Sequence, residues 1–207
     1  GEWASKLAKS IDCNVFASDS NSNLDLSIVD DLKNIGVEVE TGEHSNRLLD
    51  SDIIIKSPGI SNDVEILKKL EQSNTQIVSE IEFAGMISNV NNICITGTNG
   101  KTTTVSLITK ILSEELNVLK SGNIGIPFSQ IVFEHKLYED NDIDYCILEL
   151  SSFQLEHCSH LKKEVSAFIN ISTDHMDRYD NFDDYFNTKL KVFDNSKYCF
   201  FNNDDKI

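Results

Sequence analysis

The chain is short of positive charge. Its 207 residues include 18 lysines and arginines against 34 aspartates and glutamates, which gives a formal net charge of −16 at pH 7. The basic residues are scattered, whereas nucleic acids and anionic membranes are bound through clustered basic side chains. We therefore expect no nucleic-acid partner and no membrane partner, and any anionic ligand has to be held by a local site.

Long hydrophobic runs are also lacking. No stretch reaches the roughly 20 residues that span a bilayer, and residues 1–3 have neither the basic nor the apolar segment of a signal peptide. Cysteines are few and odd in number, five in all, and three of them lie in apolar, strand-like runs where a thiol acts as a small hydrophobic group. These features predict a reducing, cytoplasmic location.

Short apolar or β-branched runs alternate with longer amphipathic segments. The predicted strands are 13–17, 53–56, 76–78, 92–95, 144–149, 165–171 and 198–201, and the predicted helices are 25–35, 63–72, 80–87, 100–115, 127–133 and 183–194. This alternation predicts an α/β fold with parallel sheets covered by helices. The polar stretch 88–92 is the candidate linker between two domains, 1–90 and 91–207.

Both ends of the chain look cut. A predicted helix over 4–10 is followed at once by the predicted strand 13–17, as in an α/β unit that has lost its first strand and turn. The chain also stops at residues 202–207, just after a strand-like run. We expect the chain to be a fragment of a longer protein.

The most informative segment follows the apolar run 93–95 and reads Thr96-Gly97-Thr98-Asn99-Gly100-Lys101-Thr102-Thr103-Thr104. A β-type run that stops at two glycines and continues as a helix surrounds an anion with backbone N–H groups, with the helix dipole behind them. Lys101 would place its charge on the outer phosphates, and Thr102 would offer a hydroxyl to Mg²⁺. The segment thus predicts a phosphate-binding loop.

This loop departs from the common pattern G-x-x-x-x-G-K-[ST], which needs a glycine at position 95, where the chain has Ile95. We therefore expect a compact loop whose first glycine is Gly97. The alternative is a Gly-Lys turn that only caps a helix. The strand before the loop and the helical pattern over 103–111 favour phosphate binding.

A phosphate loop needs a metal ion, and the ligands for that ion come from the ends of neighbouring strands. The run 145–150 is almost wholly apolar and contains a single carboxylate, Glu149, which is costly to bury without a partner. We expect Glu149 to bind Mg²⁺ beside Thr102, and pairing with a core arginine is the alternative. Ser151 and Gln154 follow in the same loop and suit substrate contacts.

The next apolar run, 165–171, delivers His175 to the same predicted sheet edge, between two aspartates. His175 is a candidate metal ligand, and a surface histidine in a capping loop is the alternative. The two histidines and one cysteine of segment 157–160 have a spacing that suggests zinc, but such a polar stretch is more often surface.

Lys189 stands on the apolar face of a predicted helix. The residues that share this face at the 3.6-residue period are Phe182, Tyr185, Phe186, Lys189, Leu190 and Phe193. A lysine that extends its charged end to solvent is the usual explanation. The alternative is a buried lysine with a shifted pKa that can be modified.

Two segments of the first half are weaker candidates. Asp19 comes at the end of the predicted strand 13–17, where a carboxylate could hold a ribose or base, or could simply cap a turn. Ser57 and Gly59 flank a proline after the predicted strand 53–56, which by itself indicates a turn.

Together, these motifs resemble the Mur ligase superfamily, the ATP-dependent amide-forming enzymes of peptidoglycan precursor synthesis. The compact loop 97–103 is similar to the superfamily's ATP motif, which folylpolyglutamate synthetases share. Segments 122–125, 149–156 and 174–179 resemble the members that add D-glutamate. The resemblance spans essentially the whole chain and is less specific over the first 90 residues.

The resemblance implies that ATP phosphorylates the carboxylate of UDP-N-acetylmuramoyl-L-alanine, and that the amine of D-glutamate then attacks the acyl phosphate. It implies that Lys101 and the loop amides stabilise charge on the transferring phosphoryl group. Two Mg²⁺ ions are implied, one on Thr102 and Glu149 and one on Glu149 and His175, with a carbamylated Lys189 helping to fix the second. The implied ATP contacts are Gly97, Thr98, Asn99, Gly100, Lys101, Thr102 and Thr103, and the implied substrate contacts are Asn123, Ser151 and Gln154 for muramoyl-alanine and Asp19, Ser57 and Gly59 for uridine.

The same resemblance implies a Rossmann-like UDP-sugar-binding domain over 1–90, without its first strand, and an incomplete P-loop, ATP-binding central domain over 91–207. It also leads us to expect that the C-terminal domain of the family lies outside this chain. We expect a monomer that is not a competent ligase by itself. Another ligase of the superfamily, adding a different amino acid or glutamate to a folate, is one alternative, and a non-catalytic nucleotide-binding module is the other.

Overall fold

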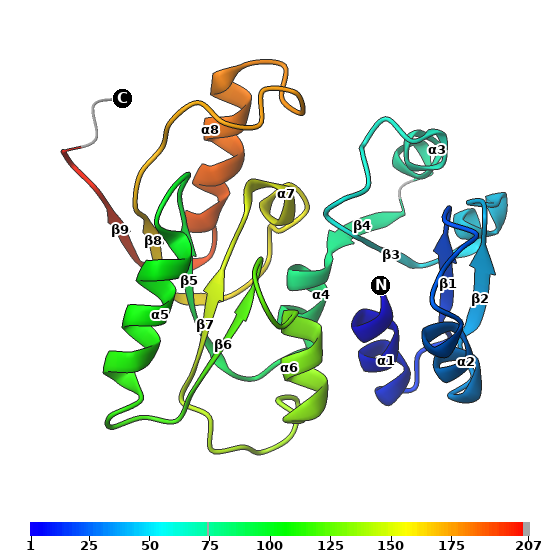
Figure 1. The fold of residues 1–207 in the computed structure, drawn as a ribbon, viewed down its shortest axis with the longest axis horizontal. Coiled ribbons are helices and arrows are strands. Elements are labelled where there is room, and N and C mark those ends of the chain that lie inside the picture. The colour runs from blue at the N-terminus through cyan, green and yellow to red at the C-terminus, as the bar shows by residue number, and fades with distance from the viewer. Residues whose placement is uncertain (74, 205–207) are drawn as a thin grey trace.

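The structure is a computed structural model that describes residues 1–73 and 75–204. Its helices and 3₁₀ turns are α1 (Glu2–Ser10), α2 (Leu26–Asn34), η1 (Asn46–Asp50), α3 (Glu65–Gln72), α4 (Glu80–Ile87), α5 (Lys101–Leu112), α6 (Phe128–Glu134), α7 (Ser152–Leu155), α8 (Phe182–Leu190) and η2 (Lys191–Phe193). Its strands are β1 (Phe16–Asp19), β2 (Glu38–Thr41), β3 (Ile53–Lys56), β4 (Gln76–Ser79), β5 (Asn91–Thr96), β6 (Val118–Gly122), β7 (Tyr145–Glu149), β8 (Lys163–Phe168) and β9 (Ser196–Phe201). Strands and helices alternate along the chain, so the predicted α/β class is confirmed (Figure 1).

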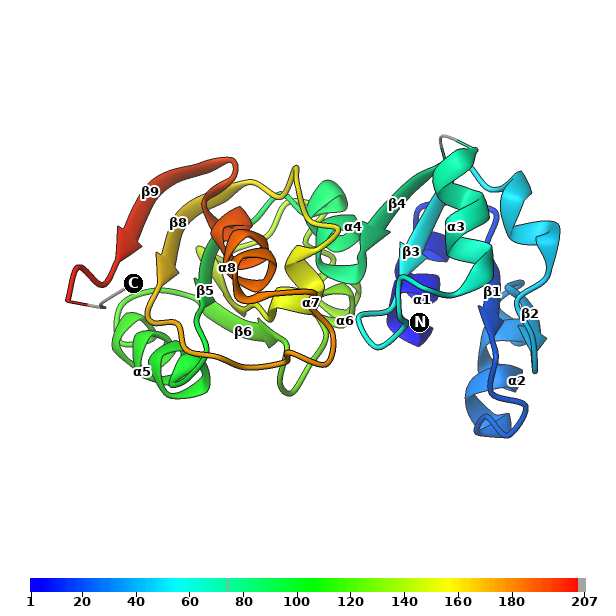
Figure 2. The ribbon, with the colours of Figure 1, turned by 90° about the horizontal axis from the view of Figure 1, so that it is seen from above.

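The second half of the chain is built on a five-stranded sheet with the strand order β6-β7-β5-β8-β9, in which all neighbours are parallel. Strand β5 lies in the middle. Its Cys94 faces a core formed with α4, α6 and α8, whereas Ile93 and Ile95 pack on the other face under Val105 of α5. Figure 2 shows α5 and α8 on opposite sides of this sheet. Because a central parallel strand is buried on both faces, it reads as a continuous apolar run.

The first half contains two separate two-stranded parallel sheets, β1-β2 and β3-β4. Helices α1 and α4 connect this half to the second one, because Leu7 of α1 and Ile81 of α4 belong to the same core as Phe128 and Val132 of α6. The Trp3 and Phe133 rings add an aromatic contact, with centroids 6.0 Å apart. The two halves therefore share a hydrophobic core.

Two strands were not predicted, β2 and β6. The β2 sequence alternates glutamate with a valine and a threonine and is half exposed, and β6 contains a lysine and lies at one edge of the five-stranded sheet. Edge strands are buried on fewer sides and so need no apolar run. The strand predicted at 13–17 is instead found at Phe16–Asp19, because the Cys13 backbone N–H bonds back to the Ala8 carbonyl and closes α1.

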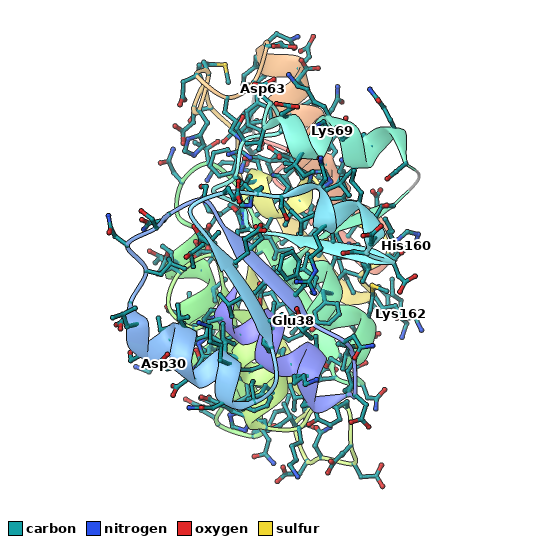
Figure 3. The ribbon with its side chains drawn as sticks, turned by 90° about the vertical axis from the view of Figure 1, so that its right-hand side faces the viewer. Asp30, Glu38, Asp63, Lys69, His160 and Lys162 are labelled. Atoms are coloured by element: carbon teal, nitrogen blue, oxygen red, sulfur yellow. The ribbon has the colours of Figure 1, made fainter. Side chains whose placement is uncertain are left out.

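Charged side chains of both signs are dispersed over the outer face of the first half. Figure 3 shows Asp30, Glu38, Asp63 and Lys69 on this face, with His160 and Lys162 at the right-hand side of the view. Of the helices that the structure describes, none combines the length and the apolar character needed to cross a bilayer.

Candidate active site

The loop between β5 and α5 requires glycine at two positions. Gly100 precedes α5 in the left-handed region with φ +79°, which residues with a Cβ rarely adopt. At Gly97, an added Cβ would lie 2.6 Å from Ile169 Cγ1 and 3.2 Å from the Asn170 carbonyl oxygen. The compact loop is therefore packed tightly against the segment that follows β8.

Asn170 holds the loop in shape, a role that was not predicted. Its Oδ1 accepts hydrogen bonds from the backbone N–H groups of Thr98 (3.2 Å) and Asn99 (2.9 Å), and its Nδ2 donates to the Asn99 carbonyl (2.8 Å). The sequence feature that could have identified Asn170 is its position just after β8, because β8 pairs with β5. With the first two amides engaged in this way, the loop presents the N-terminus of α5 to a ligand.

Two lysines converge on one carbonyl oxygen of this loop. Lys101 Nζ donates to the Gly97 oxygen at 2.9 Å and to the Thr98 oxygen at 3.0 Å, and Lys189 Nζ donates to the same Gly97 oxygen at 2.8 Å. Lys189 is only 2% exposed, so it does not extend to solvent. Burial, followed by the charge of Lys101, lowers the pKa of Lys189 to about 7. A substantial fraction of this amine is therefore uncharged at neutral pH.

Glu149 ends β7 beside the loop and is 3% exposed. Its Oε2 accepts a hydrogen bond from Thr102 Oγ1 at 2.8 Å, and its Oε1 accepts one from Asn123 Nδ2 at 3.2 Å. Both partners are neutral, so the carboxylate keeps its capacity to bind a cation. A hydroxyl and a carboxylate side by side are oxygen ligands that suit Mg²⁺.

Gly122 fixes the position of the Glu149 backbone. A Cβ at Gly122 would lie 2.2 Å from the Glu149 carbonyl oxygen, at a φ of +119°. We expect Gly122→Ala to lower the free energy of unfolding by about 3 kcal/mol, through steric overlap and backbone strain together. Urea denaturation measures this.

Gly125→Ala is the matched control for this prediction, because Gly125 also has a positive φ (+86°) but no atom within 4 Å of the added Cβ. We expect this control to cost about 1 kcal/mol, the strain alone. Equal losses in the two variants would contradict the close contact at Gly122.

His175 lies beside the Tyr185 ring, on its side away from the phosphate loop. Its exposed ring lies 4.8 Å from the Phe153 ring and 6.4 Å from the Tyr185 ring, centroid to centroid. The Tyr185 ring also lies 5.0 Å from Lys189 Nζ, and the Tyr185 hydroxyl is 3.1 Å from Thr98 Oγ1. Tyr185 thus separates His175 from the loop and its lysine, and it is a second residue of the site that was not given a role from the sequence.

The segment 157–160 sends its side chains to different partners. His157 Nε2 is 3.4 Å from Asn62 Oδ1, His160 Nδ1 is 3.1 Å from Glu82 Oε1, and Cys158 is buried. Across residues 1–73 and 75–204, no three His, Cys, Asp or Glu side chains are grouped so as to hold a metal ion. The zinc alternative for this segment therefore has no support.

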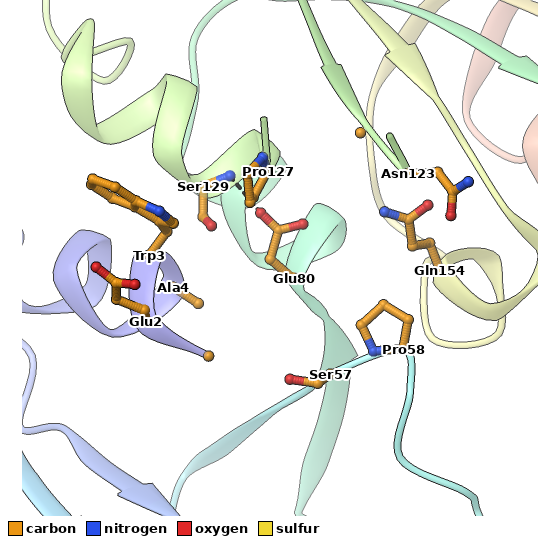
Figure 4. A pocket seen from close by; sticks show the side chains of 12 residues that line it. Glu2, Trp3, Ala4, Ser57, Pro58, Glu80, Asn123, Pro127, Ser129 and Gln154 are labelled. Atoms are coloured by element: carbon orange, nitrogen blue, oxygen red, sulfur yellow. Dashed lines mark hydrogen bonds between the residues drawn. The ribbon is translucent and has the colours of Figure 1, made fainter. Parts of the chain in front are cut away.

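Three of the predicted substrate residues, Ser57, Asn123 and Gln154, line one cavity of about 390 Å³. Figure 4 shows Ser57 entering from the first half of the chain, opposite Asn123 and Gln154 from the second half. Glu80 also lines the cavity, beside Ser129 and Pro127 in Figure 4, and accepts a hydrogen bond from the Ser129 backbone N–H (2.5 Å). The cavity thus lies between the two halves, next to the Glu149 contact made by Asn123.

The other predicted substrate residues have local roles. Ser151 caps α7. Its backbone N–H and its hydroxyl both donate hydrogen bonds to the Gln154 side-chain oxygen at 3.0 Å. Asp19 is exposed, and its Oδ1 accepts a hydrogen bond from the Asn21 backbone N–H at 2.9 Å, as in a turn. Gly59 follows Ser57 and Pro58 in the turn after β3.

Comparison with known proteins gives two family matches. Residues 95–207 match the Mur ligase middle domain, and residues 3–66 match the MurD N-terminal domain. The chain is similar to the UDP-N-acetylmuramoylalanine--D-glutamate ligases of Bacteroides fragilis (41% identity over 217 residues) and Chloroherpeton thalassium (36% over 217 residues). Each alignment covers 100% of this chain, and 46% and 45% of the respective relatives. The chain therefore spans about half the length of the curated relatives it matches.

One solved structure supports the fold. A UDP-N-acetylmuramate:L-alanyl-gamma-D-glutamyl-meso-diaminopimelate ligase from Neisseria meningitides superposes with a TM-score of 0.58 at 14% sequence identity. The match covers 99% of this chain and 68% of that one. At this identity, the likeness concerns the arrangement of the strands and helices alone.

Proposed function

We propose a function for a chain that belongs to the Mur ligase family, as the match of residues 95–207 to the middle domain of that family shows. It forms part of an ATP-dependent ligase that joins D-glutamate to UDP-N-acetylmuramoyl-L-alanine. The observation that carries this proposal is the convergence of Lys101 and Lys189 on the Gly97 carbonyl beside the Thr102–Glu149 contact. The names of its curated relatives support the choice of D-glutamate.

The site fits ATP and Mg²⁺. The glycine-bounded loop and the N-terminus of α5 suit phosphate groups, and Thr102 with Glu149 would hold a first ion, which would neutralise charge on the phosphates. Lys101, which now bonds two loop carbonyls, would stabilise the transferring phosphoryl group. His175 together with Glu149 would hold a second ion.

Lys189 is suited to carbamylation. Its pKa of about 7 leaves uncharged amine that can attack carbon dioxide, forming an N–C bond and releasing one proton. The product is a carboxylate at the end of a buried side chain. In the structure the unmodified amine of this side chain donates a hydrogen bond to the Gly97 carbonyl. Such a group would add an oxygen ligand for the second Mg²⁺ ion.

The cavity between the two halves would hold the nucleotide-sugar substrate. Asn123, Ser151 and Gln154 would contact the muramoyl-alanine part, while Asp19 and the Ser57–Gly59 turn would lie near the uridine. In this proposal residues 1–90 form the UDP-sugar-binding domain and residues 91–207 the ATP-binding domain, within a cytoplasmic monomer. Further domains of the whole enzyme would complete the adenine and D-glutamate sites.

The test is release of ADP by the full-length protein with UDP-N-acetylmuramoyl-L-alanine while the amino acid is varied. We expect turnover with D-glutamate and a rate at least about 100-fold lower with other amino acids, because a site built to pair a charged group rejects ligands that leave it unpaired. Turnover independent of D-glutamate would point to another ligase of the family. Nucleotide binding without any ADP release would point to a non-catalytic module.

A further inference from the structure

Glu156 lies at the C-terminal end of α7, and its carboxylate gathers contacts from both halves of the protein. Its Oε2 accepts hydrogen bonds from Arg178 Nη2 and from Asn62 Nδ2, each at 3.2 Å, and its Oε1 accepts one from the Tyr179 hydroxyl at 3.0 Å. The side chain is 10% exposed. One nearly buried carboxylate thus joins segments that are more than 90 residues apart in the sequence.

On the side of the first half, Glu156 is the counter-charge of a buried lysine. Lys56 is 3% exposed, and its Nζ lies 3.8 Å from Glu156 Oε2 and has no hydrogen-bond partner among the described residues. Removing one member of such a pair leaves an uncompensated charge in the interior. Lys56 ends β3 and directly precedes the Ser57–Gly59 turn, so Glu156 contacts the side chain of the residue that enters this turn. Asn62, whose Nδ2 donates to Glu156, lies after the turn.

On the side of the second half, the contacts of Glu156 lead to His175. The Arg178 guanidinium lies 4.4 Å from the Phe153 ring centroid, and the centroid of the His175 ring lies 4.8 Å from that of Phe153. Tyr179 stacks on the same Phe153 ring at 6.2 Å. Arg178 Nη2 also donates to the Ile60 carbonyl at 3.3 Å. Arg178 is therefore held by Glu156 and by the Ile60 carbonyl, and it packs on the ring that contacts His175.

We propose that Glu156 is a positioning residue that sets the Ser57–Gly59 turn relative to the loop carrying His175. Its carboxylate contacts Lys56 and Asn62 on either side of the turn, and Arg178 and Tyr179 a few residues after His175. The roles of the Ser57–Gly59 turn and of His175 in the reaction depend on the proposed function. The connection between them through Glu156 depends only on the contacts described above.

The kinetic test is Glu156→Gln in the full-length protein, which keeps the side-chain volume and removes the charge. Loss of one charge-assisted contact to a buried group corresponds to about a tenfold change in an equilibrium constant. We expect the KM for the nucleotide-sugar substrate to rise about tenfold and the KM for ATP to change less than twofold, because Glu149 and the 97–104 loop do not contact Glu156. An unchanged KM for the nucleotide-sugar would overturn the proposal.

Glu82→Gln is the matched control, because Glu82 is also a buried carboxylate, and it accepts hydrogen bonds from the backbone N–H groups of His160 (2.7 Å) and Leu161 (2.9 Å). A purely structural effect reduces the active fraction, and hence kcat, without changing either KM. If Glu156→Gln does not fold, Asn62→Ala removes the exposed Nδ2 donor, together with the long Oδ1 contact to His157, and is expected to raise the nucleotide-sugar KM about threefold. An unchanged KM in that variant would overturn the proposal as well.

Hydrogen exchange tests the positioning role of Glu156 independently of the proposed function. In Glu156→Gln, the amides of segments 57–63 and 174–179 should both exchange about tenfold faster, with no such change in Glu82→Gln. Faster exchange in both segments of a protein without D-glutamate-dependent turnover would support the role of Glu156 while the proposed function fails. Wild-type exchange in either segment would overturn the role of Glu156, whatever the turnover.

Discussion

Lys189→Met is expected to make the protein more stable and the enzyme inactive. The folded-state pKa of Lys189 is about 7, against 10.5 for an ordinary lysine. Between these two values the unfolded chain binds more protons than the folded one, so the stability of the wild type rises with pH across this window. Below pH 7 both states are protonated, and the folded protein carries the full cost of a buried ammonium.

Methionine has a similar volume and removes that cost. After subtracting about 1 kcal/mol for the lost hydrogen bond to Gly97, we expect the free energy of unfolding to rise by up to about 4 kcal/mol at pH 6. The gain should shrink steadily as the pH approaches 10.5. Urea denaturation in buffers free of carbon dioxide measures it, so that the wild-type amine stays unmodified.

In the full-length enzyme, the same variant should lose turnover by about 1,000-fold, because it removes a group proposed to fix a metal ion beside the reacting phosphate. Lys120→Met is the control, since this lysine is exposed and, among the described residues, its amine donates a hydrogen bond to Ser106 alone. This variant should change neither the stability nor the turnover. A Lys189→Met protein that is less stable at pH 6 than the wild type, or that remains active, would contradict the role assigned to Lys189.

Lys101→Met is expected to reduce kcat by about 100- to 1,000-fold, the usual effect of removing one group that stabilises charge on a transferring phosphoryl. Its contacts in the structure are two loop carbonyls, so the free energy of unfolding should change by no more than about 1 kcal/mol. Steady-state kinetics with varied ATP separates a loss in kcat from a change in KM.

Lys110→Met provides the comparison for Lys101, because it alters a lysine of the last turn of the same helix, far along α5 from the loop. We expect wild-type kinetics for it. A Lys101→Met enzyme with kcat within tenfold of the wild type would mean that the loop binds phosphate without contributing to its transfer.

The central part of the site could be predicted from the sequence because its signals are local. Strands buried on two faces read as continuous apolar runs, which located β5 and β7 and therefore the loop and Glu149. The 3.6-residue period placed Lys189 on the buried face of α8, where the structure finds it. The edge strands β2 and β6 give no such run, and they were missed.

The contacts that connect the site could not be predicted, because they depend on partners far apart in the chain. Asn170 is one polar residue after a strand, and only the pairing of β8 with β5 brings it to the loop. Likewise, Glu156 was visible in a motif, but its contacts with Lys56 and Asn62 cross between the two halves of the protein. Sequence patterns indicate which faces are buried, and the register between elements decides which side chains meet.

The central claim is that this site uses ATP to phosphorylate a substrate carboxylate. The most direct measurement starts from UDP-N-acetylmuramoyl-L-alanine labelled with ¹⁸O in both carboxylate oxygens, and follows the label in a turnover by the full-length enzyme. One labelled oxygen bonds to the γ-phosphorus and leaves with inorganic phosphate when the amine attacks, while the other stays in the new amide. We predict one ¹⁸O atom in each phosphate released, and unlabelled phosphate alongside amide product would contradict the account.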